Sequence, residues 1–530
     1  MLKKLLCLFL CFALCCGLFT GCGKEDISFI YTVSGTPDTL DPQLADSDVE
    51  RILAANLFEG LFRLNAEGEP VPAACESYTV SSDGLTWTFT LREDMYYYTD
   101  PEDTEAVPVP VVAEDFVFAL QRLFDRSGSS PYRQNFLDIE GAAAVTAGEA
   151  GPESLAVAAA GDRTLVIRLI APDADLPRRL CCAGAMPCSR TFYEATEGTY
   201  GLEPDTLLAN GLFYLTLWSN ENGVTLGGVL PRDGMVNKGR LVPVESLRAE
   251  GLSAAQRLEQ EITSGEFLTG VPETNADTLF CVQTMQLLFN CSGSQLSNAD
   301  VRAGLASILY RSLPQELPEG ISTAAGLVPD SVTFNGKSWR ETAGSLLNAA
   351  LPADAAAAYR QGLADLGKEK LSGITVLVPD TPEWHAFYET ISLAWQQQLS
   401  AFFSVQYLPE EEILAAVQAG NYDIAFLTTR AVQNNIVDIL AAYSTGSTEN
   451  LTGFHDPAYD ALLNTILTAQ TAAQKTAALR EAECHLLRLW PTVPIVTLTD
   501  HFALAPGFAG VAALPFGPVL DFAAATYTAP

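Results

Sequence analysis

The chain offers few residues whose types and spacing match a catalytic centre. It contains no Gly-x-Ser-x-Gly or Ser-x-x-Lys nucleophile motif, no His-Glu-x-x-His metal motif and no phosphate-binding loop. The histidines number only four, and none is paired with another at metal-ligand spacing: His385, His455, His485 and His501. We therefore expect a protein without enzymatic activity, whose charged side chains act in non-covalent binding.

The cysteines could form a metal site or a disulfide. Of the 12 cysteines, five lie within the first 22 residues, and the others are Cys75, Cys181, Cys182, Cys188, Cys281, Cys291 and Cys484. These lack the paired spacing of a zinc site, so we expect neither a metal nor another cofactor. Buried free thiols are the expected state, although a disulfide from Cys181 or Cys182 to Cys188 is compatible with an exported protein.

Length and charge narrow the class further. A chain of 530 residues with 48% apolar residues is too long for one core, and it should divide into two or three globular lobes. The formal net charge is −34, and no basic block interrupts it. Nucleic acids and anionic membrane surfaces attract clustered Lys and Arg, so we expect neither as a partner.

The N-terminus has the pattern of an export signal. Two lysines precede an apolar run from Leu5 to Thr20. The motif Phe19-Thr20-Gly21-Cys22 resembles the lipobox of bacterial lipoproteins, in which the cysteine is lipid-modified. We expect residues 1–22 to be a lipoprotein signal peptide with Cys22 as the lipidation site. The chain would then be held by lipid at the cell surface, or on the periplasmic side of the cytoplasmic membrane.

Three stretches of the first part of the chain have clear periodicity. From Val49 to Phe62 the apolar residues fall at helical spacing, which predicts an amphipathic helix. From Leu85 to Leu91 apolar residues alternate with threonines, which predicts a strand with one buried face. Helical spacing returns from Ala113 to Phe124.

The second half predicts a parallel sheet. Strands and helices alternate there, as strand Ile374–Val378, helix Trp384–Leu399, strand Phe403–Tyr407, helix Glu411–Gln418 and strand Tyr422–Leu427. This order implies parallel strands joined by right-handed crossovers. Before this region, Asp300 is expected to cap a helix; after it, Pro491–Leu498 is expected to be a strand that returns to the first lobe.

Several segments resemble one family in the same order along the chain. They are LDPQ, LFEGLFR, PVPA, SSDGLTWTFTLRED and VVAEDFVFALQRLFD. Further on, Asn210-Gly211-Leu212-Phe213 resembles the family's Asn-Gly-Pro-Phe turn, and Leu287–Ser312 also matches. The family is the extracytoplasmic solute-binding proteins of ABC importers, family 5, whose members carry oligopeptides, dipeptides and nickel.

The resemblance implies the fold and its division. It implies an α/β, two-lobed periplasmic-binding-protein-like fold with an additional domain and a ligand cleft between the lobes. In the numbering of this chain, lobe I would comprise residues 25–60, 165–275 and 490–530, the additional domain residues 61–164, and lobe II residues 276–489.

The resemblance also implies binding residues on two facing segments. One segment is Asp46, Ser47 and Asp48, whose main chain would pair with an extended ligand. The opposite edge would be the end of the strand that continues into Thr428, Thr429 and Arg430. Two such edges give sequence-independent affinity, because every peptide offers the same backbone donors and acceptors.

Two positions depart from the family's peptide binders. Val432 stands where these proteins carry the Asp that pairs with the peptide's α-ammonium, and Glu410 replaces an aromatic residue of a side-chain pocket. Either another acid, Asp46, Asp48 or Glu410, takes over the ammonium, or the ligand is not a free-amine peptide. In the second case Arg430 is a candidate for binding a ligand carboxylate.

These observations predict the substrate-binding component of an ABC transporter. It would capture an oligopeptide or peptide-like solute as a monomer and deliver it to the permease subunits in the membrane. The alternative is a non-transport surface receptor or interaction protein on the same fold, or a nickel- or metallophore-binding relative.

Overall fold

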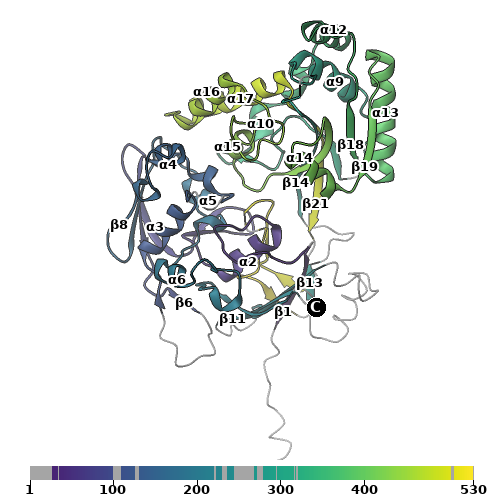
Figure 1. Ribbon diagram of the computed structural model, residues 1–530. Helices are drawn as coiled ribbons and strands as arrows, with labels where there is room; N and C mark the ends of the chain where they lie inside the picture. The colour runs from purple at the N-terminus through teal and green to yellow at the C-terminus, as the bar shows by residue number, and fades with distance from the viewer. Residues whose placement is uncertain are drawn as a thin grey trace, which may run out of the picture.

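The computed structural model describes most of the chain. The described residues are 27–33, 35–98, 109–125, 130–219, 223–229, 235–243, 268–270, 278–293, 295–314, 317, 320–502, 507–517 and 519–528. The expected signal peptide and Cys22 lie outside them. Figure 1 shows two bodies: lobe I with the additional domain, mainly purple and blue, and lobe II, mainly green. Strands β14 (Thr278–Phe289) and β21 (Thr492–Phe502) lie at the junction.

Lobe I is built on a five-stranded sheet in the order β10-β11-β12-β1-β13. Strand β1 (Ser28–Val33) pairs in parallel with β12 (Lys238–Pro243) and with β13 (Leu268–Gly270). Strand β11 (Gly223–Gly228) is antiparallel to its neighbours β12 and β10 (Phe213–Ser219). Phe29 of β1 stacks on Phe522 with the ring centroids 5.5 Å apart, so the C-terminal segment completes this core.

Helix α2 (Asp48–Leu57) packs in the same core through Val49, Ile52 and Leu53. Its apolar face confirms the predicted helix, but the predicted end at Phe62 is wrong. The helix stops at Leu57 because Phe58 has an extended backbone, and Phe62 already begins strand β2 (Phe62–Leu64).

The additional domain contains a four-stranded antiparallel sheet in the order β4-β5-β9-β8. Its strands are β4 (Cys75–Val80), β5 (Thr86–Leu91), β9 (Thr164–Arg168) and β8 (Val157–Ala159). Trp87, Phe89 and Leu91 are buried while the threonines between them are half-buried, as the alternation predicted. Strand β9 carries this sheet past residue 164, which was the expected domain boundary.

Helix α3 (Ala113–Arg122) packs against β8 and β9 of this sheet. Shorter elements complete the first body: β3 (Pro70–Pro72) paired with β2, β6 (Tyr96–Tyr97) paired with β7 (Val109–Pro110), α4 (Ala142–Ala147), α5 (Leu176–Arg179), α6 (Arg190–Ala195), and the 3₁₀ turns η1 (Arg133–Phe136), η2 (Pro152–Ser154), η3 (Ala183–Ala185) and η4 (Pro204–Thr206).

Lobe II is built on a six-stranded sheet in the order β15-β21-β14-β20-β18-β19. Besides β14 and β21, its strands are β15 (Ile321–Thr323), β20 (Ile424–Arg430), β18 (Thr375–Pro379) and β19 (Ser404–Leu408). Strand β18 is parallel to both β19 and β20, so the predicted β-α-β-α-β unit is confirmed. A small hairpin of β16 (Thr333–Phe334) and β17 (Lys337–Ser338) lies outside this sheet.

The helices of lobe II cover the sheet and its end. They are α9 (Ala299–Arg311), α10 (Trp339–Ala343), α11 (Leu347–Ala350), α12 (Ala355–Asp365), α13 (Pro382–Leu399), α14 (Glu410–Gln418), α15 (Ile436–Ala441), α16 (Pro457–Leu467) and α17 (Ala472–Leu489). The expected cap of α9 was wrong: Asn298, not Asp300, accepts the first backbone N–H groups, because Asp300 already lies inside the helix.

The end of the chain crosses back between the bodies. Strand β21 pairs with β14 and β15 within lobe II, although lobe I was expected to resume at residue 490. The return to lobe I is complete at β22 (Phe508–Ala509), whose Phe508 joins the Phe29 core. The remaining strands there are β23 (Ala512–Ala513), β24 (Leu520–Asp521) and β25 (Thr526–Tyr527).

Within the ranges that the structure describes, no helix combines the length and apolarity needed to cross a bilayer.

Candidate functional site

A cavity of about 380 Å³ lies where the two bodies meet. The first body contributes Asp46, from the loop before α2, and Pro131, from the segment before η1. Lobe II contributes the rest of the lining, chiefly from β14, from the end of β20 and from α15 with the loop that follows it. The volume falls within the range of small-molecule sites, roughly 300 to 1,000 Å³.

Half of the sequence-predicted binding residues line this cavity. They are Asp46, Thr429, Arg430 and Val432. The two predicted segments therefore do face each other, one from each body. They meet because β20 ends at Arg430, whose Nη1 lies 3.6 Å from Oδ2 of Asp48 at the start of α2.

Ser47 and Asp48 do not line the cavity; their side chains make contacts at the start of α2. The Ser47 hydroxyl caps α2 by accepting from the backbone N–H of Glu50, while the Glu50 carboxylate accepts from the backbone N–H of Ser47 at 3.1 Å. Asp48 pairs with Arg51 of its own helix and lies 3.6 Å from Nη1 of Arg430. This second contact joins lobe I to lobe II at the edge of the cavity.

Glu410 and Thr428 are placed together but outside the cavity lining. The Glu410 carboxylate accepts from the backbone N–H of Thr428 at 3.0 Å. Glu410 is exposed at the start of α14, and this bond ties the start of α14 to the end of β20 instead of offering a free acid to a ligand.

A buried hydrogen-bond network forms the floor of the cavity. The amide of Gln286 on β14 donates to the Thr429 hydroxyl, and its carbonyl oxygen accepts from Tyr443 at 3.0 Å and from Thr492 at 2.7 Å. Burial raises the pKa of Tyr443 to about 12, so its hydroxyl stays a donor. Three different elements are thus locked around one amide, which gives the cavity a rigid wall.

Three polar side chains of the cavity lie outside every predicted segment. Asp438 of α15 is half-buried, Glu449 in the following loop is exposed, and Thr284 of β14 is only 2% exposed. Burial raises the pKa of Asp438 to about 7, and Glu449 adds to the shift. No periodicity or motif marks these residues, so sequence reasoning missed them.

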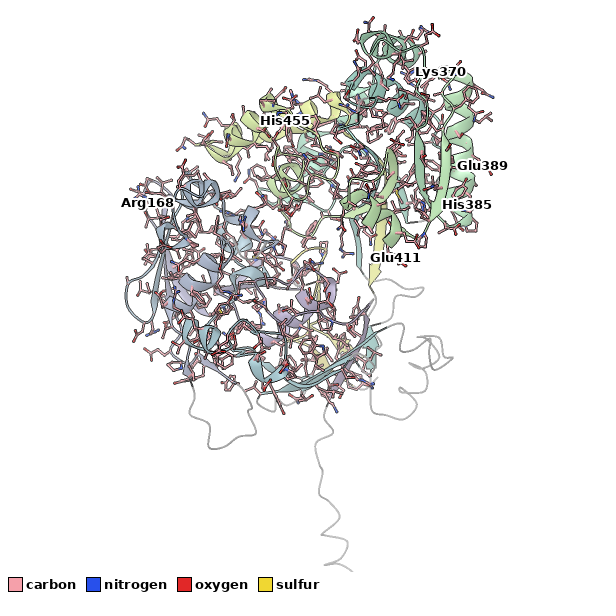
Figure 2. The ribbon with its side chains drawn as sticks, viewed as in Figure 1. Arg168, Lys370, His385, Glu389, Glu411 and His455 are labelled. Carbon is pink, nitrogen blue, oxygen red and sulfur yellow. The ribbon has the colours of Figure 1, made fainter. Side chains whose placement is uncertain are left out.

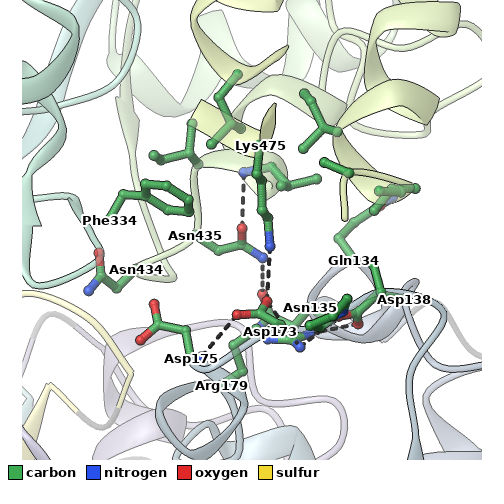
Figure 3. Close-up of a pocket in the computed structure, with 18 of the residues that line it drawn as sticks. Gln134, Asn135, Asp138, Asp173, Asp175, Arg179, Phe334, Asn434, Asn435 and Lys475 are labelled. Atoms are coloured by element: carbon green, nitrogen blue, oxygen red, sulfur yellow. Dashed lines mark hydrogen bonds and ion pairs between the residues drawn. The ribbon is translucent and has the colours of Figure 1, made fainter. Parts of the chain in front are cut away.

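Contacts beyond the cavity also hold the two bodies together. Nζ of Lys475 on α17 lies 2.9 Å from Oδ2 of Asp173, and the Asn435 amide donates to Oδ1 of Asn135 at 2.8 Å. Figure 3 shows both contacts around a smaller cavity of about 60 Å³. Near the C-terminal segment, the backbone N–H of Gly517 donates to the carbonyl of Val432 at 3.3 Å. The structure is therefore a closed arrangement of the lobes.

The family-like motifs of lobe I support this site from behind. The Asn210 side chain accepts from the backbone N–H of Glu59 at 3.0 Å and donates to its carbonyl at 2.9 Å. The next residue, Gly211, donates to the Leu57 carbonyl at 2.8 Å. The LFEGLFR and NGLF segments are thus bonded to each other, which fixes where α2 ends.

Six cysteines are free thiols, so no disulfide joins Cys181 or Cys182 to Cys188; the six are Cys75, Cys181, Cys182, Cys188, Cys291 and Cys484. Cys181 and Cys182 pack in the core of the additional domain, whereas Cys188 packs in the core of lobe I. Burial raises the pKa of Cys182 and Cys188 to about 12, so these thiols are inert packing groups.

Histidines do not gather into a metal site in the described ranges. His385 and His455 lie apart on lobe II (Figure 2), where His385 contacts Asp380 at 2.9 Å and His455 contacts Thr445 at 2.8 Å. Among the described residues, no group of three His, Cys, Asp or Glu side chains could hold a metal ion. The side chain of His501 lies outside the described set.

The two bodies, the strands that cross between them and the cavity where they meet define a two-lobed fold. Comparisons with known proteins agree with this two-lobed architecture. The family model of bacterial extracellular solute-binding proteins, family 5 middle, matches residues 69–227. The predicted resemblance to this family is therefore confirmed.

Relatives extend the similarity to nearly the whole chain. The chain is 25% identical over 481 residues to the dipeptide-binding protein DppE of Bacillus subtilis, covering 87% of this chain and 84% of DppE. It is also 25% identical over 480 residues to the probable deoxycholate-binding periplasmic protein YgiS of Escherichia coli, covering 88% of this chain and 87% of YgiS.

A solved structure shows the same fold. The substrate-binding domain of an oligopeptide ABC transporter from Bacillus anthracis superposes with a TM-score of 0.74 at 24% identity, over 95% of this chain and 100% of the other. The predicted α/β, two-lobed fold is thus confirmed.

Proposed function

We propose that this chain is the substrate-binding component of an ABC importer that captures a peptide or peptide-like solute. The observation that carries the proposal is the 380 Å³ cavity, to which the first body contributes Asp46 and lobe II contributes Thr429 and Arg430. A ligand in it touches both bodies, so it binds the closed arrangement more tightly than an open one. The resemblance to DppE supports a peptide as the ligand.

Delivery follows from closure without covalent chemistry. The closed form is the signal that a membrane permease would read, and the permease would be powered by a cytoplasmic ATPase. We further propose that the protein works as a monomer without enzymatic activity. Lipid attachment at Cys22 would place it beside the permease on the outer side of the membrane.

The proposed domains follow the sheets. We place the start of the additional domain after Phe58, the residue that follows α2. We extend the domain through β9 to Cys181 and Cys182, which pack in its core. Lobe II would then include β21, and lobe I would resume with β22.

A thermal-shift assay with a library of di- to octapeptides tests the function. A bound ligand raises the unfolding midpoint with the logarithm of its concentration over its dissociation constant, so even weak binders are visible. We expect a subset of peptides to raise the midpoint, and native mass spectrometry of the same samples to show one peptide per chain. If no peptide raises the midpoint and no complex is seen, peptide capture is wrong and the surface-receptor alternative gains.

A further inference from the structure

We propose that the cavity between the lobes recognises an ammonium group of the ligand through Asp438, assisted by Thr284 and Glu449. This inference rests on the proposed capture of a peptide and deepens it, because it names the chemical group that the site selects. The ammonium can come from a peptide N-terminus or from a lysine side chain.

The first observation is an acid without a partner. The Asp438 carboxylate lines the cavity, and within the described part of the chain it has no hydrogen bond and no ion pair. Two other acids beside the cavity are engaged: Asp48 pairs with Arg51 and Arg430, and Glu410 accepts from a backbone N–H. A partly buried carboxylate costs free energy unless a cation or donor satisfies it, so Asp438 is set to receive one.

The second observation is independent of charge. Thr284 lies on β14, lines the same cavity and is 2% exposed. Its hydroxyl oxygen has no hydrogen-bond partner among the described groups. Buried hydroxyls are normally satisfied, and an orphan one that lines a cavity marks a place where a ligand's donor completes the bonding.

The charge of the lining selects a cation. The charged side chains that line the cavity are Asp46, Asp438 and Glu449 against the single base Arg430, and Arg430 already faces Asp48 at 3.6 Å. The excess negative charge of the lining comes from Asp438 on α15 and from Glu449 in the loop that follows it. An ammonium carries three donors, which match the Asp438 carboxylate, the Thr284 hydroxyl and the Glu449 carboxylate.

An organic cation fits better than a metal ion. A metal site would need three acidic, His or Cys ligands close together, and the described residues contain no such group. Asp438 and Glu449 supply two acids, with a hydroxyl in place of the third. Val432 stands where peptide binders carry an acid, and Asp438 on α15, six positions further along the chain, would supply the missing carboxylate.

The test measures which form of a peptide library the purified chain retains. The library of di- to octapeptides is offered free, acetylated only at the N-terminus, and acetylated at every amine, with native mass spectrometry as the readout. We expect the free library to bind and the fully acetylated one not to bind. Loss on N-terminal acetylation alone assigns the ammonium to the peptide N-terminus, and retention assigns it to a lysine side chain.

Variants then tie the selectivity to the site. D438N should weaken the retained peptide roughly 10- to 100-fold, the range expected for a hydrogen bond to a charged group. T284V, which leaves every charge in place, should weaken it roughly 2- to 10-fold. D365N is the matched control, because Asp365 is exposed on α12 and does not line the cavity, and it should bind like the unaltered chain.

The possible outcomes distinguish failure of the ammonium site from failure of the proposed peptide capture. If free and fully acetylated peptides bind equally, or D438N and T284V both bind like the unaltered chain, peptide capture stands and the ammonium site is wrong. If no form of the library binds, the proposed function fails and the ammonium site fails with it. A cooperative melting curve checks that each variant is folded; if D438N is not, T284V decides.

Discussion

Nζ of Lys475 lies 2.9 Å from Oδ2 of Asp173, and this ion pair ties a helix of lobe II to the first body. Burial of Asp173 disfavours its charged form, but Arg179 and Lys475 outweigh burial and lower its pKa. The pair forms only when the lobes approach, so it stabilises the closed arrangement even before a ligand arrives.

The first prediction concerns this pair. K475M should open the ligand-free protein and weaken ligand affinity roughly two- to five-fold, since a partly exposed pair contributes about 1 kcal/mol or less. Small-angle scattering should show a larger radius of gyration. K370M alters an exposed lysine after α12 and serves as the control. Identical scattering from K475M and the unaltered chain would show that the pair does not influence closure.

The second prediction concerns the weaker contact between the lobes. Arg430 lies 3.6 Å from Asp48, which is already paired with Arg51. A double-mutant cycle with D48N and R430M, measured by ligand affinity, should give a coupling of less than about 1 kcal/mol. A coupling of several kcal/mol would mean that this pair, and not the ligand, dominates closure.

The third prediction concerns pH. The folded-state pKa of Asp438 is about 7 against an ordinary value of 3.8, so the folded chain binds more protons than the unfolded chain between these values. Stability without ligand should therefore fall as pH rises from 5 to 8, by at most about 3 kcal/mol, because about two units of the shift lie above pH 5 and each is worth ~1.4 kcal/mol. Urea unfolding at both pH values measures this.

The control for this experiment is D438N, which should lose most of the pH dependence. Asp115, whose burial raises its pKa to about 6, contributes in the same direction and is retained in the variant. Ligand affinity should have the opposite trend and strengthen from pH 5.5 to pH 7.5, because the charged Asp438 is the form that binds an ammonium. Equal slopes for both proteins would contradict the assignment of the pH dependence to Asp438.

The fourth prediction concerns the bond between the two family-like motifs. A Cβ on Gly211 would stand 2.5 Å from the carbonyl carbon and oxygen of Leu57, which are backbone atoms and cannot rotate away. G211A should reduce the free energy of unfolding by about 1–3 kcal/mol, the usual cost of overpacking. G35A, where a Cβ meets nothing within 4 Å, should change it little. Equal stability of the two variants would show that the α2 end can shift freely.

The fifth prediction concerns the core of lobe II. Glu483 is fully buried; it accepts from the Trp339 indole at 2.7 Å and from the Leu327 backbone N–H at 2.9 Å, and it pairs with Arg340. E483A should cost about 3–5 kcal/mol in urea unfolding, because it leaves Arg340 buried without its partner. E481A, at an exposed position of the same helix, should be near neutral. A small effect of E483A would mean that water replaces the carboxylate.

Local patterns predicted the elements well because they depend on residues that are close in sequence. The alternation around Trp87 and Phe89 predicted β5, and the parallel unit of β18, β19 and β20 followed from the order of apolar runs. Their exact ends did not follow, since caps such as Asn298 and the extended Phe58 depend on single backbone conformations.

The sequence by itself determined the fold class, most of the elements, and which two segments face each other across the cavity, because periodicity and family-like motifs depend on the order of residues along the chain. Only the tertiary structure decided which polar groups the cavity contains. Thr284, Asp438 and Glu449 come from separate elements and line one cavity because β14 pairs with β20, and Tyr443 after α15 donates to Gln286 of β14. The unpaired state of Asp438 likewise depends on what the fold places around it, which no local pattern specifies.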